Sequence, residues 1–301
     1  MKNIVYLFVF VFVFLAGAGR TQAEPVKLVH NGLNLVGEFV VAEDRKPSDN
    51  VTLLLHGTLA HLGMETIKGL QDVLTERGHN TLSINLSLNL NNRTGMYDCA
   101  VPHRHLYGDA VGELTAWLDW LAAKGVKNVT MFGHSRGAGQ VALFDARKGH
   151  DLVKQMVLMA PGIWNKERAA NLFQRTHGRP LEEVLVEAHA LSGSGEGNFI
   201  MERVGFFHCL EADVTADSFL SYYEPKSRVD TTTLLSRIKL PVLVVAAGQD
   251  EVVPDVAEKV KPLTSAENLQ LAIVEDAGHF FLDLFAEDVA DAIEEFLDPA
   301  S

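Results

Sequence analysis

The chain has 301 residues, of which 47% are hydrophobic and 22% charged, and its formal net charge at pH 7 is −13. This composition is typical of a soluble globular protein with a full core and one large domain or two small ones. An acidic surface repels phosphate backbones and anionic lipid headgroups, so nucleic-acid and membrane-surface partners are disfavoured.

The N-terminal segment has the three parts of a secretory signal peptide. Lys2 precedes an uncharged apolar run from Ile4 to Gly19, and small residues follow up to Ala23, where a signal peptidase would cleave. The run is shorter than the roughly 20 residues that span a bilayer. We predict a signal peptide over residues 1–23 and a periplasmic or secreted protein without a stable membrane anchor. An uncleaved anchor is the alternative.

Short β-rich runs alternate with helical stretches along the rest of the chain. The predicted strands are Leu33–Ala42, Val51–His56, Thr81–Leu86, Val126–Phe132, Gln155–Ala160, Val242–Ala247 and Leu269–Glu275. The later runs are continuously apolar, as expected of parallel strands covered on both faces. Amphipathic helices are predicted from about Tyr107 to Lys124 and from about Asp283 to Leu297. The alternation predicts an α/β fold with a mostly parallel, doubly wound sheet.

One long stretch interrupts this alternation. Residues 163–239 contain polar helical segments, a Gly- and Ser-rich run and several aromatic residues, but no convincing buried strand. A connection of this length is rarely structureless in a compact domain. We therefore predict a helical lid over residues 163–239, inserted into a core formed by residues 24–162 and 240–301.

The segment Val129–Gly139 contains the most informative motif of the chain. An apolar strand leads into Gly133-His134-Ser135-Arg136-Gly137, and small residues then begin a helix. A turn this sharp exposes the serine hydroxyl above the sheet, and the glycines avoid clashes with neighbouring backbone. The motif predicts Ser135 as a nucleophile, whereas an ordinary glycine turn is the alternative.

Two further residues complete a candidate catalytic triad. A serine hydroxyl needs a base to remove its proton, and His279 directly follows the last predicted strand. Asp250 follows the preceding strand and would orient the imidazole, so all three side chains meet at the carboxyl edge of the sheet. A helix N-cap for Asp250 and a surface histidine for His279 are the alternatives.

A buried strand that ends in His56-Gly57 predicts an oxyanion hole. Backbone N–H groups fixed beside the nucleophile stabilise the negative charge that develops on the carbonyl oxygen. We assign these donors to the N–H groups of Thr58 and Arg136, with Leu59 as the alternative to Thr58. His56 is expected to shape the loop and not to act as the base.

From about Val51 to Leu297 the chain resembles the α/β-hydrolase superfamily, in the branch of serine esterases, lipases and serine aminopeptidases. The motifs that carry the resemblance are His56-Gly57, Gly133-His134-Ser135-Arg136-Gly137, Asp250-x-x-Val253-Pro254 and Gly278-His279. The resemblance implies hydrolysis through a covalent acyl-serine intermediate, with no cofactor. It says little about the substrate.

The chain has two cysteines, Cys99 and Cys209. Each lies in an excursion at the catalytic edge, and an exported protein meets oxidising conditions, so we predict a disulfide that ties the lid to the core. Two reduced thiols are the alternative. His103 and His105 raise the question of a metal site, but no third ligand is evident, so we predict none.

Two residues near the nucleophile have open roles. Arg136 could bind a substrate carboxylate, although such a side chain more often packs or pairs structurally. Trp164, at the start of the lid, could line the substrate pocket or belong to the core.

The prediction that follows is an exported serine hydrolase, most simply a carboxylesterase for a small or medium acyl ester. The first alternative is an amidase or aminopeptidase-like enzyme in which an acidic lid residue, such as Glu196, Glu202 or Glu211, holds a substrate amine. The second is a non-catalytic binding protein that retains the fold. The sequence does not indicate the oligomeric state.

Overall fold

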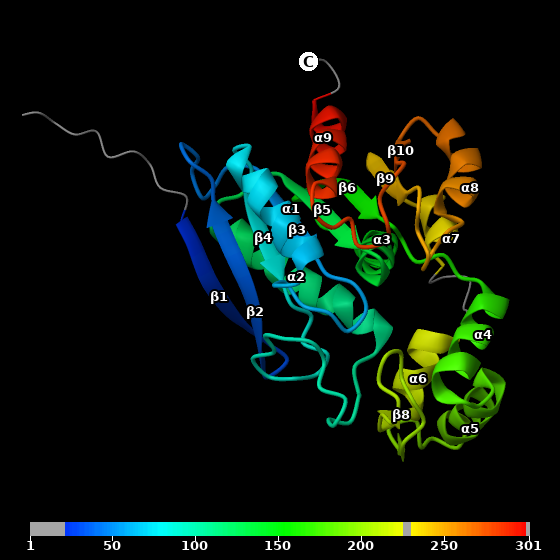
Figure 1. Ribbon diagram of the computed structural model, residues 1–301. Coiled ribbons are helices and arrows are strands. Elements are labelled where there is room, and N and C mark those ends of the chain that lie inside the picture. Colours follow the sequence, from blue (N-terminus) through cyan, green and yellow to red (C-terminus); the bar gives the residue numbers. More distant parts are fainter. Residues whose placement is uncertain (1–21, 225–229, 299–301) are drawn as a thin grey trace, which may run out of the picture.

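The computed structural model of the chain describes residues 22–224 and 230–298. Of the predicted signal peptide, residues 1–21 lie outside the described residues. Figure 1 shows a central twisted sheet with helices packed on it and a second group of helices at one end of the molecule. The sheet carries the candidate catalytic residues.

The elements follow one another as the alternating sequence pattern predicts. The strands are β1 (Gln22–His30), β2 (Leu33–Val41), β3 (Val51–Leu55), β4 (Asn80–Ile84), β5 (Val129–His134), β6 (Val153–Met159), β7 (Ile200–Met201), β8 (Val214–Thr215), β9 (Val242–Ala247) and β10 (Leu269–Val274). The helices are α1 (Glu65–Glu76), α2 (Ala110–Ala123), α3 (Arg136–Arg147), α4 (Lys166–His177), α5 (Leu181–Gly193), α6 (Ala216–Tyr223), α7 (Thr231–Leu235), α8 (Val256–Val260) and α9 (Phe285–Leu297). Short 3-10 turns precede α2 at Tyr107–Asp109 and follow α8 at Lys261–Ser265.

The main sheet has eight strands in the order β1-β2-β4-β3-β5-β6-β9-β10. Neighbouring strands are parallel from β4 to β10, whereas β2 is antiparallel to both β1 and β4. The pairs α1 with α9 and α2 with α3 pack on the sheet. The central strands β3 and β5 are buried at every position, because helices cover them, which explains their continuous apolar runs. The predicted mostly parallel, doubly wound sheet is thus confirmed.

The edge strand β1 is absent from the predicted strands. It forms a hairpin with β2 through Asn31 and Gly32, which have φ values of 49° and 80°. The predicted cleavage after Ala23 falls inside β1. A chain that begins at Glu24 retains the strand pairs from Glu24–Phe39 to His30–Leu33, so cleavage at this point is compatible with the sheet.

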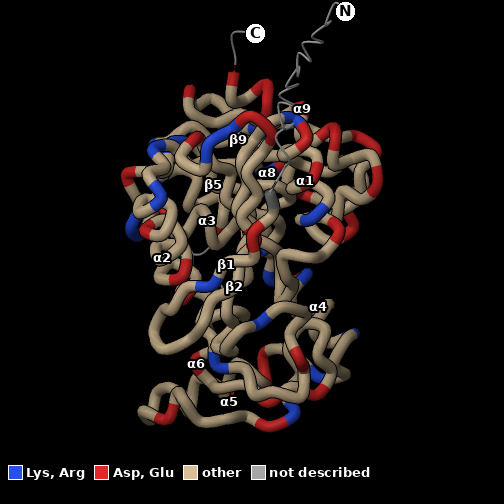
Figure 2. The backbone as a smooth tube through the Cα atoms, turned by 90° about the vertical axis from the view of Figure 1, so that its left-hand side faces the viewer, with Lys and Arg blue, Asp and Glu red and all other residues tan. Residues whose placement is uncertain are grey.

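The segment 163–239, called the insertion below, connects β6 to β9. Its helices α4, α5 and α6 gather at the end of the molecule opposite to α9 in both Figure 1 and Figure 2. The insertion is not wholly helical, because β7 and β8 form a small antiparallel sheet within it. The helix α7, within the same segment, packs on α3 of the core.

The described residues carry both signs of charge. In Figure 2 acidic and basic residues are interspersed along the core and the insertion. No helix within residues 22–224 and 230–298 is both long and apolar enough to cross a membrane.

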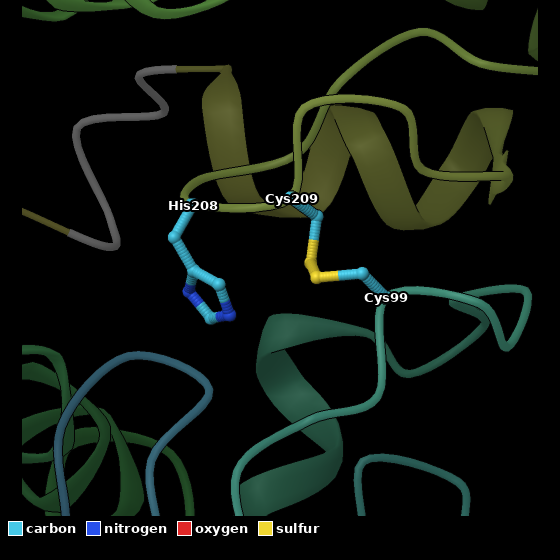
Figure 3. Close-up of side chains that lie close together, drawn as sticks. All are labelled: Cys99, His208 and Cys209. Atoms are coloured by element: carbon cyan, nitrogen blue, oxygen red, sulfur yellow. A yellow bond between two sulfur atoms is a disulfide. The ribbon is translucent and has the colours of Figure 1, made fainter.

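A disulfide joins Cys99, in the excursion after β4, to Cys209 in the insertion (Figure 3). The two Cα atoms are 5.4 Å apart, and 110 positions separate the cysteines in the sequence. In an unfolded chain this crosslink removes the conformations of a long loop. The disulfide therefore ties the insertion to the core and lowers the entropy of the unfolded state.

Replacement of both cysteines by serine is expected to lower the free energy of unfolding by up to about 4–5 kcal/mol, the entropy of closing the loop. Urea denaturation with and without reductant measures the change. Reductant should destabilise the wild type and leave the variant unaffected. An equal effect of reductant on both proteins would contradict a disulfide between Cys99 and Cys209.

Candidate active site

Ser135 occupies a sharp turn between β5, which ends at His134, and α3, which begins at Arg136. Its backbone has φ 55° and ψ −119°, a strained conformation for a residue with a side chain. A Cβ atom at Gly133 would clash with the backbone of α3, and one at Gly137 would overlap the carbonyl oxygen of His56. The two glycines therefore permit the turn that raises the Ser135 hydroxyl above the sheet.

The structure brings Ser135, His279 and Asp250 together. The Oγ of Ser135 lies 3.0 Å from Nε2 of His279. The Nδ1 of His279 lies 2.9 Å from Oδ2 of Asp250 and 3.2 Å from Oδ1. Because β5, β9 and β10 are parallel, the loops that follow them meet at one edge of the sheet. This is the geometry of a nucleophile, a base and an orienting acid.

Asp250 is buried but remains ionised. Burial alone would raise the pKa of its carboxyl group. Hydrogen bonds from His279 and from the N–H groups of Val253 and Val252 outweigh burial and hold the pKa below its ordinary value. Oδ1 accepts the two backbone bonds at 2.7 and 2.8 Å. Oδ2 is thereby left to accept the N–H of His279 and to fix its tautomer.

His134, just before the nucleophile, has a role that the sequence analysis did not identify. Its Nε2 lies 3.0 Å from the carbonyl oxygen of His279. Burial, with a smaller effect of His279, lowers the pKa of His134 to about 3. The neutral ring must donate through Nε2, because a carbonyl oxygen only accepts. His134 thus holds the backbone of the candidate base in place.

The loop after β3 lies against the nucleophile, since a Cβ atom at Gly57 would be 3.3 Å from Cβ of Ser135. The N–H groups of Thr58, Leu59 and Arg136 make no hydrogen bond to another described residue. They can therefore donate to an oxyanion, as the sequence analysis expects of Thr58 and Arg136. Leu59, with φ 53°, remains the alternative donor.

A second residue that the sequence analysis missed, Arg93, holds this loop. Its buried guanidinium donates to Nε2 of His56 at 2.8 Å and to the carbonyl oxygen of Ala60 at 2.6 Å. His56 in turn donates through Nδ1 to the carbonyl oxygen of Gly57 at 2.8 Å. Burial, followed by the charge of Arg93, lowers the pKa of His56 well below its ordinary value. A neutral His56 that bonds Arg93 and Gly57 fits the loop-shaping role expected from the sequence.

A cavity of about 390 Å³ opens beside Ser135. Thr58 and Tyr107 line it from the core, and Leu172 and Tyr222 line it from the insertion. Trp164 also lines the cavity, which decides between its two predicted roles. The volume is within the range of small-molecule sites, and it is formed jointly by the two parts of the chain.

Among the described residues, the buried histidines His103 and His105 belong to no cluster of three or more His, Cys, Asp or Glu side chains that could share a metal ion. His103 shares a hydrogen bond of 2.8 Å with Ser218, and His105 one of 2.8 Å with Tyr222. These contacts join the loop after β4 to α6 of the insertion.

A second possible metal site is the cluster of Cys99, His208 and Cys209, and Figure 3 shows His208 beside the disulfide. The sulfur atoms there are bonded to each other, so they offer no thiolate to a metal.

Comparison with known proteins gives one family and several similar folds. The sequence pattern described as "Alpha/beta hydrolase family" matches residues 53–292. Est1E from Butyrivibrio proteoclasticus is 17% identical, with a TM-score of 0.63 over 91% of this chain and 97% of that chain. The Pyrococcus furiosus esterase Pf2001 is 16% identical, with a TM-score of 0.61 over 93% of this chain and 91% of that chain. No curated protein matches the sequence. At these identities the likeness of the structures concerns the fold.

Proposed function

This chain belongs to the alpha/beta hydrolase family, and we propose that it is an exported serine hydrolase that cleaves small or medium carboxylic esters. One observation carries the proposal. Ser135, His279 and Asp250 are linked by hydrogen bonds of 3.0 and 2.9 Å, and Ser135 faces a cavity of about 390 Å³. This combination suits attack on a carbonyl carbon.

The proposed mechanism has two halves. In the first, His279 takes the proton of Ser135 as the oxygen attacks the ester carbonyl, and the N–H groups of Thr58 and Arg136 stabilise the oxyanion. His279 then protonates the leaving alcohol, which leaves an acyl-serine. In the second half, His279 activates water to release the acid and free enzyme, while Asp250 stabilises the imidazolium.

The amide alternative requires an acidic residue of the insertion close to Ser135. The acidic residues that suggested it, Glu196, Glu202 and Glu211, are exposed, and none lines the cavity beside Ser135. Glu211 instead pairs with Arg203. These three residues are therefore not positioned to hold a substrate amine. Glu224 and Asp230 of the insertion do line the cavity, so the comparison of acyl esters with aminoacyl amides below tests the amide alternative.

Two features support export. The first is the predicted signal peptide, of which residues 1–21 lie outside the described residues. The second is the disulfide between Cys99 and Cys209, because such bonds persist in the periplasm and outside the cell. The insertion, placed over the cavity, is proposed to act as a lid.

A fluorophosphonate probe is expected to label Ser135 alone, because only a serine activated by a base attacks the phosphorus. Peptide mass spectrometry locates the label. Ser221 is a matched control for labelling, since it lines the same cavity, but among the described residues its hydroxyl bonds to the backbone of Ser218 and Tyr107 and not to a histidine. Ser221→Ala should still be labelled, and hydrolysis of acyl esters of increasing length should exceed that of aminoacyl amides. An unlabelled wild type would favour the non-catalytic alternative.

A further inference from the structure

The guanidinium of Arg136 lies in the cavity wall beside the nucleophile. Its Nε donates to Oγ1 of Thr58 at 3.1 Å. Its Cζ lies 4.4 Å from the ring centre of Phe207 and 5.5 Å from that of Tyr222, both in the insertion. These contacts fix the plane of the guanidinium but leave the two Nη groups without a hydrogen bond to any described residue. No acidic side chain pairs with Arg136 among the described ion pairs, so its charge is available to a ligand.

Tyr107 offers a second donor on the same wall. It is only 6% exposed, yet it lines the cavity, and its hydroxyl makes no hydrogen bond to a residue that the structure describes. A Cβ atom at Gly139 would lie 2.6 Å from this hydroxyl. Tyr107 and Arg136 also share a neighbour, because the ring centre of Tyr222 lies 5.6 Å from that of Tyr107 and 5.5 Å from Cζ of Arg136. Burial raises the pKa of Tyr107 to about 12, and the hydroxyl therefore keeps its proton.

The acidic residues of the cavity are occupied or exposed. Asp230 caps α7 and accepts the backbone N–H groups of Thr233 and Trp164. Oε1 of Glu224 lies 3.3 Å from Nε2 of His189. Glu251 is exposed at the cavity mouth, where water screens its charge. Arg136 is half-buried, so its charge acts on a ligand more strongly than that of Glu251 does.

We infer that Arg136 and Tyr107 form an anion subsite, and that the substrate is an ester that also carries a carboxylate within a few bonds of the scissile carbonyl. This inference rests on the proposed serine hydrolase function. The Nη groups of Arg136 and the hydroxyl of Tyr107 would donate to the carboxylate, while Thr58, held by the same guanidinium, faces the oxyanion. Half-esters of short dicarboxylic acids have this chemistry.

The test compares monomethyl glutarate with methyl 4-carbamoylbutanoate, which has nearly the same shape but a neutral amide in place of the carboxylate. The wild type should prefer the half-ester in kcat/KM. Arg136→Gln should lower that preference about 10- to 100-fold, as expected for loss of charge-assisted hydrogen bonds. Tyr107→Phe, which removes only the hydroxyl, should lower it about 3- to 10-fold.

Arg175→Gln is the matched control, because Arg175 also lines the cavity but is exposed on α4. It should change the preference less than about twofold, since solvent screens an exposed charge. If Arg175→Gln and Arg136→Gln lowered the preference for the half-ester equally, the preference would come from the positive charge around the cavity opening, and the inference would be overturned. The inference would also be overturned if neither Arg136→Gln nor Tyr107→Phe changed the preference.

Binding to Ser135→Ala tests the subsite without turnover and separates it from the proposed function. Calorimetry should detect monomethyl glutarate, and adding Arg136→Gln should weaken its binding about 10- to 100-fold. Failure of hydrolysis and labelling in the wild type, with this binding intact, would reject the hydrolase and retain the subsite. No binding up to about 10 mM, or equal binding by both variants, would overturn the subsite whatever the fate of the ester assay.

Discussion

Ser135→Ala is expected to lower kcat for ester hydrolysis by about 10⁴- to 10⁶-fold, because the triad residues act as a unit. The change removes one oxygen atom, the one that lies 3.0 Å from Nε2 of His279. Without it no acyl-serine forms, and the oxyanion donors alone cannot supply a nucleophile. Initial rates on the best ester of the wild type, with the uncatalysed rate subtracted, measure the loss.

The fold of Ser135→Ala should be unchanged, so the loss is catalytic. The backbone N–H of Ser135 donates to Met159 at 2.8 Å, and alanine keeps this bond. The variant should therefore match the wild type in circular dichroism and melting temperature. Turnover by Ser135→Ala near that of the wild type would reject Ser135 as the nucleophile.

The central sheet was predictable because strands buried on both faces have continuous apolar runs in the sequence. The β9 strand occupies its predicted range, Val242–Ala247, and β2 and β10 each end one residue earlier than predicted. The edge strand β1 has no continuous apolar run, because one side of it faces solvent, where Val29 is 73% exposed. Its signal was the Asn31-Gly32 pair, whose positive φ angles match the twist of a tight hairpin.

The three candidate catalytic residues could be located because each lies within five positions of the end of a strand, β5, β9 or β10. The order of parallel strands then brings them to one edge of the sheet. Arg93 and His134 were beyond the reach of such reasoning. Arg93 binds His56 across 37 positions, and His134 binds His279 across 145 positions. Contacts of this kind depend on how loops fold back, which neither motif nor periodicity encodes.

The insertion was predictable as an interruption of the strand pattern but not in its internal structure. Two-residue strands such as β7 and β8 are too short to show a period of two. The short helix α7 lies within the predicted insertion but packs on α3 of the core. A change in composition along the sequence does not reveal such a contact. The Tyr107 hydroxyl, which has no hydrogen-bond partner among the described residues, is likewise a property of the assembled cavity alone.

Asp250→Asn is expected to lower kcat about 10³- to 10⁴-fold, because it would select the wrong tautomer of His279. In the wild type Oδ1 accepts the N–H groups of Val252 and Val253. An asparagine that keeps these bonds with its oxygen presents its NH₂ group to Nδ1 of His279. Nδ1 must then accept, the proton moves to Nε2, and Nε2 can no longer take the proton of Ser135.

Glu251→Gln is the matched control for this prediction. Glu251 is the adjacent acid, but it is exposed and makes no hydrogen bond to a described residue, so its replacement should change kcat less than about threefold. Measuring kcat of both variants with one ester separates a local effect on His279 from a general loss of negative charge. Equal losses of kcat would show that negative charge near His279 supports catalysis, and not the hydrogen bond between Nδ1 of His279 and Asp250. A larger loss in Glu251→Gln would identify Glu251 as the orienting acid.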